Sequence, residues 1–318
     1  LIGEAFVRIF LDLPNKDYRK LFVSDQSVGY KMQSNFVGTQ GPVKLFTNDN
    51  GHRILGNQNK EEIEYDIVVF GDSFVFGHLT EYENTFVNLI DEKTKSKVLN
   101  AGVSGYNLNQ IHNAAKEYLE LNNPKVVIVS IHVASDITSQ IRQDVNWLKV
   151  VYGSLFRTDD PSDYYEYVLR SFLSHYSDLY YWAFEMKIKQ IYHKLNILYK
   201  KEDVINIDEQ IYIEEDIKEL ENKKIKFDDF IVKFQGLINS NTVLIFLLIP
   251  SINDLKHFEE ISDYNNALLV LNDREAIIID LREYFKNNYS NLIISNNDRH
   301  WNNKGHKLVG DVIHNKLM

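Results

Sequence analysis

Two hydrophobic patterns alternate along the chain from residue 64 onward. One is a short continuous apolar run, which is typical of a strand buried on both faces of a sheet. The other repeats its apolar positions every three or four residues, which is typical of an amphipathic helix. Because strand and helix alternate, the pattern predicts a parallel sheet with helices on both faces. The strands are expected within YDIVVF (65–70), KVLNAG (97–102), PKVVIVSIH (124–132), NTVLIFLLIP (241–250) and AIIID (276–280).

Five segments between and after these strands have helical spacing. The last of them closes the chain, so the predicted fold is a flavodoxin-like, three-layer α/β/α domain. The helices are expected within TEYENTFVNLIDEKT (80–94), NQIHNAAKEYLEL (109–121), FDDFIVKFQGLI (227–238), YNNALLVLN (264–272) and NKGHKLVGDVIHNKL (303–317).

Two parts of the chain depart from this alternation. Residues 1–60 are irregular and rich in turn residues, and we expect them to form an N-terminal extension packed on a core domain of residues 61–318. Residues from about 140 to 225 are rich in Tyr, Phe, Trp and Leu at helical spacing, and then in Glu, Asp and Lys. They predict a helical insertion, which either packs on the sheet or forms a lid or wall over a site.

Composition excludes several classes of protein. The chain has 318 residues, of which 44% are hydrophobic, enough for one α/β domain with an insertion. A net charge of −10 without a basic stripe argues against nucleic-acid binding. The absence of cysteine excludes disulfides, thiolate catalysis and zinc–cysteine sites.

No apolar run approaches the ~20 residues of a membrane span. The chain begins at Leu1 rather than Met, and LIGEAFVRIF (1–10) is either the end of a removed signal or anchor segment or an ordinary amphipathic helix. The first alternative would bring the protein close to a membrane. It favours an extracytoplasmic location, periplasmic or at the cell surface, although the sequence does not decide the compartment.

Polar residues follow the predicted strands at the points where the strands end. Ser73 follows the first strand, Gly102 ends the second and Ser135 follows the third, while Asp298 and His300 precede the closing helix. In open α/β sheets the carboxyl ends of the strands form one rim, where ligands bind. The topology therefore predicts that these five residues meet.

Their chemistry fits nucleophilic catalysis. A serine hydroxyl needs a base, and His300 can accept the proton of Ser73. Asp298 lies two residues before His300, so in an extended loop its carboxylate can orient the imidazole. The backbone N–H groups of Ser73 and Gly102, with the Ser135 side chain, are candidate donors to an oxyanion.

The other histidines suggest no second site. His300 and His306 could form a metal pair, but their spacing is not that of a helical zinc motif, and no metal is expected. The remaining histidines considered have no comparable partners and are expected to be structural or exposed: His112, His132, His175 and His193.

These segments resemble the motif blocks of the SGNH, or GDSL-type, hydrolase family, in particular its larger bacterial members. VVFGDSFVFG (68–77) resembles the block with the nucleophilic serine, and VLNAGVSGYNLNQ (98–110) the block whose glycine donates to the oxyanion. NDRHWNNKGHKLVGDVI (297–313) resembles the block that supplies Asp and His. FTNDNGHRILGN (46–57) is similar to the segment before the first block, whereas the central insertion is not covered.

Two positions distinguish this chain from related patterns. Family members usually carry an oxyanion-binding Asn in their third block, where this chain has Ser135. Position 75 is Val rather than the second Gly of a Gly-x-Ser-x-Gly elbow, which favours this family over the α/β-hydrolases.

The resemblance implies a serine esterase that works through an acyl-enzyme without a metal or cofactor. Its expected substrate is a small ester or an acylated glycan, and an O-acetyl ester of a surface polysaccharide is the first candidate. Two alternatives stay open: an O-acyltransferase that uses the same triad, and a non-catalytic glycan-binding or scaffold protein with a degenerate site.

Overall fold

The computed structural model describes residues 2–10, 20–56, 64–137, 144–157, 164–183, 212–256, 262–295 and 298–318. The predicted 140–225 insertion lies partly outside these ranges, as does His193. In the described part of the chain, no helix combines the length and apolar character needed to cross a membrane.

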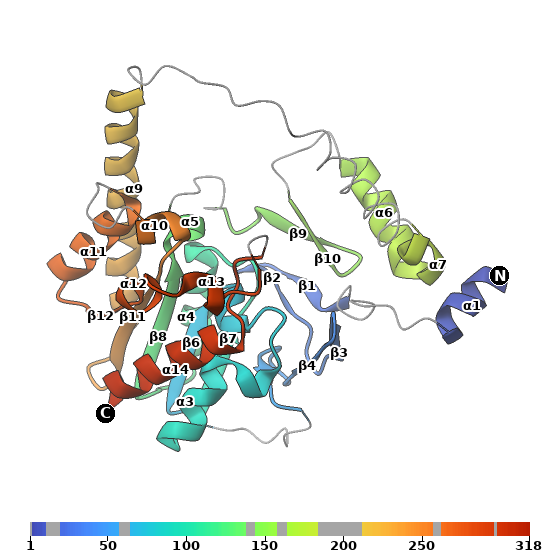
Figure 1. Cartoon of the computed structure of the whole chain (residues 1–318), viewed down its shortest axis with the longest axis horizontal. Coiled ribbons are helices and arrows are strands. Elements are labelled where there is room, and N and C mark those ends of the chain that lie inside the picture. Colours follow the sequence, from blue (N-terminus) through green and yellow to red (C-terminus); the bar gives the residue numbers. More distant parts are fainter. Residues whose placement is uncertain are drawn as a thin grey trace.

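A large mixed sheet forms the centre of the molecule (Figure 1). Its strand order is β12-β11-β8-β6-β7-β5-β4-β3. The first five strands of this order are parallel, and in chain order they run 2-1-3-4-5, the flavodoxin-like arrangement. The predicted fold class is therefore correct. The parallel strands are β6 (Ile67–Gly71), β7 (Val98–Gly102), β8 (Val126–His132), β11 (Val243–Ile249) and β12 (Ile277–Asp280).

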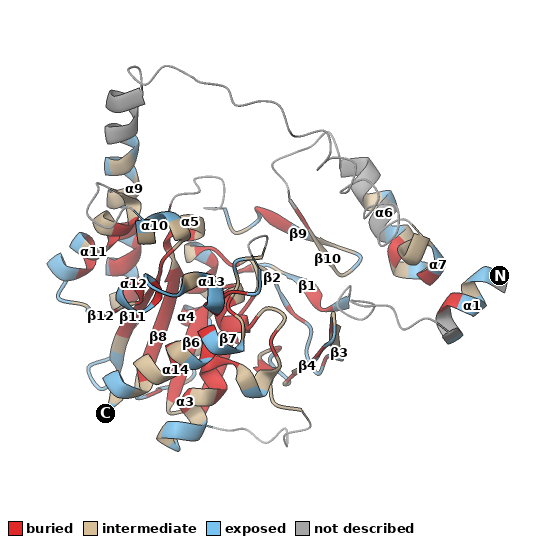
Figure 2. Ribbon diagram, viewed as in Figure 1, coloured by how far each residue is buried: buried red, intermediate tan, exposed pale blue. Residues whose placement is uncertain are grey.

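Two layers of helices cover this sheet. Alternate strand residues face opposite sides: Val68 and Phe70 belong to one apolar cluster, Ile67 and Val69 to the other. Figure 2 shows the central strands as the most continuously buried part of the molecule. The first cluster is closed by α4 (Leu108–Leu119), α9 (Tyr212–Gln235) and α11 (Asp263–Asp273), and the second by α3 (Phe86–Thr94) and α14 (Asn303–Leu317).

Short helices follow the strands at the rim of the sheet. Four of them begin one to three residues after a parallel strand ends, which places their first residues at the carboxyl edge, whereas the 3₁₀ helix and the last helix come later in the same segments. The short helices are α2 (Ser73–Phe76), the 3₁₀ helix η2 (Tyr82–Asn84), α5 (Val133–Asp136), α10 (Ile252–Lys256), α12 (Arg282–Phe285) and α13 (Tyr289–Leu292).

The N-terminal residues contain more regular structure than the sequence predicts. Instead of an irregular extension, residues 22–54 form five short strands. β5 pairs antiparallel with β7, so three of them extend the large sheet. The five are β1 (Phe22–Asp25), β2 (Gly29–Met32), β3 (Val37–Gln40), β4 (Val43–Thr47) and β5 (Arg53–Ile54).

The described part of the insertion begins with a hairpin of β9 (Leu148–Val151) and β10 (Ser154–Arg157). Helices α6 (Tyr164–Tyr176) and α7 (Asp178–Tyr180) follow, and Figure 1 shows them beside the hairpin, with α1 (Ile2–Phe10) next to α7. Tyr152 contacts the rings of Phe172 and Tyr176, and Glu4 accepts the Asp178 N–H at 2.8 Å. These two helices thus pack on the hairpin and α1, whereas α9 packs on the sheet layers.

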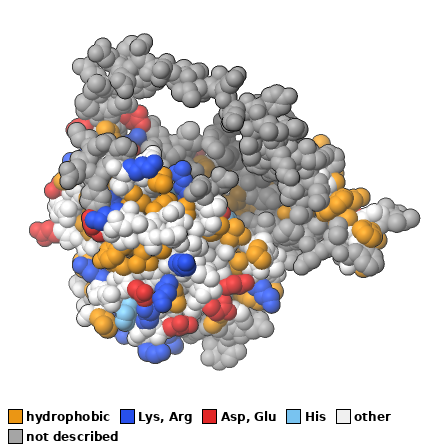
Figure 3. All heavy atoms as spheres, in the orientation of Figure 1, with side chains coloured by type: hydrophobic (Ala, Val, Ile, Leu, Met, Phe, Trp, Pro, Cys, Tyr) orange, Lys and Arg blue, Asp and Glu red, His pale blue; other side chains and the backbone are white. Residues whose placement is uncertain are grey.

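Acidic and basic side chains are interspersed on the face seen in Figure 3.

Candidate active site

The turn from β6 into α2 presents Ser73 at the rim of the sheet. Gly71 allows this turn, because a Cβ there would lie 2.5 Å from Val75 Cγ2 and 2.9 Å from Ser130 Cβ. The buried Asp72 caps α2 by accepting the Phe74 N–H at 2.9 Å, so its carboxylate has a structural function. Ser73 itself is half-buried, which leaves its hydroxyl within reach of a substrate.

The segment before α14 presents His300. It folds back on the preceding chain: the Ile294 N–H donates to His300 O at 2.9 Å, and Ile293 and Trp301 form an antiparallel bridge. Asn302 caps α14 and also donates to Ile293 O at 2.7 Å. The backbone around the histidine is therefore fixed by hydrogen bonds before any substrate binds.

Three side chains from these two segments form one hydrogen-bonded series. Ser73 Oγ lies 2.7 Å from His300 Nε2, and His300 Nδ1 lies 2.7 Å from Asp298 Oδ1. Asp298 Oδ1 also accepts the backbone N–H of His300 at 3.1 Å. A carboxylate, an imidazole and a hydroxyl in this order are the arrangement that activates a serine nucleophile.

The charge state of Asp298 suits this arrangement. Partial burial raises the pKa of its carboxyl, but the hydrogen bonds and the charge of His300 lower it more, so the pKa lies below its usual value. At neutral pH the carboxylate is thus ionised and can stabilise a positive charge on the imidazole.

Phe74 links this series to the core. Its ring contacts the rings of His132, His300 and Trp301, at centroid distances of 4.8, 5.1 and 4.9 Å. Trp301 is almost fully buried, so the face of His300 rests on a rigid aromatic layer.

The prediction for Gly102 needs correction. Its backbone N–H donates to Asn100 Oδ1 at 3.1 Å, so the structure does not direct it to an oxyanion. Glycine is needed there for space, because a Cβ would lie 2.4 Å from Phe76 N and 2.6 Å from Val75 Cβ. Gly102 thus lets β7 pack closely against α2, the helix that begins with Ser73.

Further along the same loop, the N–H groups of Ser104 and Gly105 have no hydrogen-bond partner within the described ranges. Gly105 is half-buried with φ of +82°, a conformation that favours glycine. The Ser-Gly pair in GVSGYN is the sequence signal for this second glycine. Ser73 N–H is likewise unpaired among the residues that the structure describes.

Ser135 lies on α5 at the end of β8, as the sequence predicts. Its hydroxyl, however, makes hydrogen bonds to residues of its own turn. Its Oγ lies 2.8 Å from His132 Nδ1, 3.1 Å from His132 O and 3.1 Å from Asp136 Oδ1. Donation to an oxyanion would require this hydroxyl to rotate out of these contacts.

His78, which was not predicted from the sequence, lies beside the triad. Its ring centroid lies 4.3 Å from that of His300, and its Nε2 lies 3.5 Å from Asp298 Oδ2. His306, which the sequence analysis considered and set aside as a metal partner of His300, is buried, and its Nδ1 accepts the Phe86 N–H at 3.3 Å.

His78, Asp298 and His300 together offer ligand atoms within 4.8 Å of one another. Imidazole and carboxylate ligands suit zinc. A metal ion would have to compete with the hydrogen bonds that already join His300 to Asp298 and to Ser73, so these atoms fit the serine triad better than a metal site.

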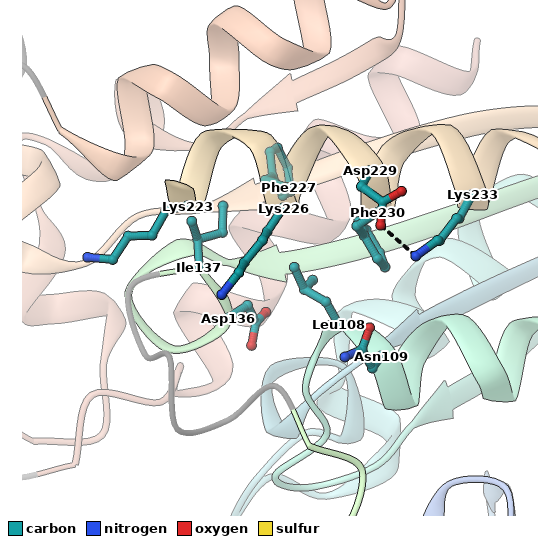
Figure 4. A pocket seen from close by; sticks show the side chains of 10 residues that line it. All are labelled: Leu108, Asn109, Asp136, Ile137, Lys223, Lys226, Phe227, Asp229, Phe230 and Lys233. Carbon is teal, nitrogen blue, oxygen red and sulfur yellow. Dashed lines mark hydrogen bonds and ion pairs between the residues drawn. The ribbon is translucent and has the colours of Figure 1, made fainter. Parts of the chain in front are cut away.

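A cavity that none of the triad residues lines lies next to the turn of Ser135. It encloses about 220 Å³ between α4, α5 and α9. Figure 4 shows its Lys233 paired with Asp229, and Lys223 pairs with Glu219 and Asp263. The lining residues are Leu108, Asn109, Asp136, Ile137, Lys223, Lys226, Phe227, Asp229, Phe230 and Lys233.

Neither a protein-family model nor a curated protein sequence matches this chain. Several solved structures do. A lipase/acylhydrolase from Enterococcus faecalis is 14% identical with a TM-score of 0.45, covering 79% of this chain and 94% of its own. The acetyl xylan esterase AlAXEase is 16% identical with a TM-score of 0.41, covering 79% and 100%. A member of the lipolytic G-D-S-L family from Veillonella parvula is 11% identical with a TM-score of 0.41, covering 77% and 94%.

These sequence identities and TM-scores are too low to support a conclusion about function. Any conclusion about function therefore depends on the residues of this chain. In the order of its motif segments and in its 2-1-3-4-5 parallel sheet, the chain resembles the SGNH, or GDSL-type, hydrolase superfamily.

Proposed function

We propose that this protein is a serine esterase. The observation that carries the proposal is the series of two 2.7 Å hydrogen bonds from Ser73 Oγ to His300 and from His300 to Asp298. Residues 227 positions apart meet in this series, at the carboxyl edge where the fold binds ligands.

In the proposed reaction, Ser73 Oγ attacks the ester carbonyl carbon while His300 Nε2 takes the hydroxyl proton. The tetrahedral intermediate collapses, the alcohol leaves with the proton from His300, and an acyl group stays on Ser73. Water then attacks the acyl group, again with His300 as base, and the carboxylic acid leaves. Asp298 keeps the proton on His300 Nδ1 and stabilises the imidazolium in each step.

The intermediate needs donors for its oxyanion. Ser73 N–H supplies one, and we place the second in the loop after β7, where Ser104 and Gly105 have unpaired N–H groups within the described chain. One such donor is worth roughly 3 kcal/mol of transition-state stabilisation. Ser135 can contribute if substrate binding releases its hydroxyl from His132.

For the substrate we propose a small ester or an acylated glycan, with an O-acetyl ester of a surface polysaccharide first. This proposal comes from the motif resemblance. The reaction as written uses only protein groups and water.

The experiment compares hydrolysis of a soluble acetyl ester and of an acetylated polysaccharide by the wild type and by Ser73→Ala and His300→Ala variants. Ser251→Ala is the matched control, since Ser251 follows the parallel strand β11 and its Oγ caps its own turn at Asp254 N, 3.4 Å away. We expect activity in the wild type and the control only.

Other outcomes identify the alternatives. Acetyl release that requires an added glycan acceptor would identify an O-acyltransferase on the same triad. Absence of turnover with every ester and acceptor would refute the esterase and favour a non-catalytic binding protein.

A further inference from the structure

The Asp298 carboxylate lies between two imidazoles. Oδ1 contacts His300 Nδ1 at 2.7 Å, and Oδ2 faces His78 Nε2 at 3.5 Å. The second distance is long for a hydrogen bond, but catalytic contacts are often long before substrate binds. His78 lies in the loop after α2, so the element that carries the nucleophile also reaches its carboxylate.

Gln40 determines which nitrogen of His78 carries the proton. Gln40 Oε1 accepts the backbone N–H of Leu79 at 3.0 Å, which fixes the orientation of the side-chain amide. The amide nitrogen then lies 3.0 Å from His78 Nδ1. Because an amide nitrogen only donates, Nδ1 must accept, and the proton of a neutral His78 is on Nε2, facing Asp298.

The loop around His78 is held from the N-terminal strands at a second point. Arg53 on β5 is 1% exposed and donates to Phe76 O at 2.5 Å, Gly77 O at 2.7 Å and Thr80 O at 2.5 Å. These carbonyls flank His78 on both sides in the chain. Gln40 on β3 is 3% exposed, so both contacts are shielded from water.

The backbone beside His78 adopts an unfavourable conformation. Leu79 has φ of +51°, in the left-handed region that is unfavourable for a residue with a side chain. This conformation brings the Leu79 N–H to Gln40. Such strain is typical of places where the surrounding structure fixes a functional group.

We propose that His78 is a positioning residue, locked by Gln40 as the Nε2–H tautomer so that it donates to Asp298 Oδ2 and fixes the carboxylate against His300. The inference deepens the proposed serine mechanism and rests on it. His78 is not a second base, since its lone pair on Nδ1 is used by Gln40.

The surroundings keep His78 neutral. The groups that face it are His300, Asp298 and Arg53; burial, followed by the charge of His300, lowers its pKa to about 4 in spite of the carboxylate. A neutral donor orients Asp298 without cancelling the negative charge that His300 needs.

The first test observes the tautomer by NMR of ¹⁵N-histidine-labelled protein, with the His78 signals assigned from a His78→Gln sample. We expect a protonated Nε2, an unprotonated Nδ1 and no titration between pH 5 and pH 8. Gln40→Leu removes the donor and should allow the other tautomer. A wild-type Nδ1–H tautomer, or titration of His78 within that interval, would overturn the proposal.

The second test separates positioning from packing by kinetics. His78→Ala should lower kcat about tenfold with KM unchanged, because an acceptor on Asp298 loses its donor. His78→Gln, which keeps a neutral N–H donor, should recover kcat to within about threefold of the wild type. His112→Ala, at another half-buried histidine, is the control and should keep the wild-type kcat.

Equal losses in His78→Ala and His78→Gln, or a kcat for His78→Ala within twofold of the wild type, would refute the positioning role. Failure of the esterase proposal is distinguishable, because an inactive wild type would still report the His78 tautomer by NMR.

Discussion

The large sheet has two halves that are built differently. Four of its five parallel strands are mostly buried; β6 and β7, for example, have no exposed residue, whereas only Ile279 of the edge strand β12 is buried. Its three antiparallel strands are only two to five residues long and less buried; in β4, buried positions alternate with exposed or partly exposed ones. Both halves contribute apolar residues to the core, but the second also carries buried polar side chains that make hydrogen bonds, Gln40 and Arg53.

The polar residues of the two halves have different uses. The segments after β6 and before α14 present Ser73, Asp298 and His300 at the rim, half-buried and accessible. In the antiparallel half, Gln40 and Arg53 point inward and are buried. They hold the loop of His78 rather than a substrate. Under the two proposals above, one half supplies the catalytic groups and the other half positions them.

The largest expected effect tests the chemical half. Asp298→Asn should lower kcat/KM about 10³- to 10⁴-fold, because an amide no longer holds the reactive tautomer of His300. Thermal unfolding should change little, since the side chain is half-buried and isosteric. Retention of more than a tenth of the wild-type kcat/KM would contradict the orienting role.

The next effect tests the hydrogen bonds by which Arg53 of the antiparallel half holds the loop of His78. Arg53→Met leaves three carbonyl groups without their donor, which should cost about 3 kcal/mol of unfolding free energy. It should also lower kcat about tenfold through the displaced His78 loop. Denaturant unfolding and ester hydrolysis measure the two effects.

Arg274→Met is the control for Arg53, because the Arg274–Asp228 pair is exposed and screened by water, so its loss should hardly change the unfolding free energy or kcat. If Arg53→Met lost stability but kept full kcat, the two halves would be independent and the comparison would fail.

A third change tests the corrected role of Gly102. Gly102→Ala retains the backbone N–H but inserts a Cβ against α2, so we expect a loss of about 2 to 3 kcal/mol in unfolding free energy. Gly236→Ala, at the end of α9 with its nearest neighbour 3.3 Å away, should be close to neutral. An unchanged unfolding free energy in Gly102→Ala would show that a methyl group fits between β7 and α2, and that glycine is not required there.

The smallest effect concerns the buried His306 on α14 and the pH dependence of stability. Burial lowers the pKa of His306 to about 3, below its unfolded value of 6.5. The unfolded state therefore binds the proton first as pH falls, so stability is full above pH 6.5 and declines below it. Between pH 7 and pH 5, the protonation of this histidine in the unfolded state should lower the unfolding free energy by about 2 kcal/mol.

His306→Gln should reduce the pH dependence of unfolding by that amount, whatever its effect at pH 7. Urea unfolding at both pH values measures the difference. An unchanged slope would show that His306 does not stay neutral in the folded protein.

The difference between the halves also explains what the sequence could predict. Continuous apolar runs such as YDIVVF identify parallel strands, and their order places Ser73 and His300 at one rim. The strands β3 to β5 were not predicted, because they are short and direct buried polar residues such as Arg53 inward. Pattern analysis assigns such residues to the surface.

Single contacts were equally hard to predict. His78 stands alone in FGHLT, with no spacing that connects it to Asp298, 220 positions later. The prediction for Gly102 did not include the contact between its N–H and Asn100 Oδ1, because the sequence does not show this contact. The domain boundary near residue 60 stays a prediction.

The central claim is that Ser73 is a nucleophile activated by His300. The most direct measurement is incubation of the folded protein with a fluorophosphonate, followed by tandem mass spectrometry of the modified peptide. The account predicts one adduct, on Ser73, which disappears in His300→Ala and after denaturation. No adduct on the folded wild type, or an adduct on another serine, would contradict it.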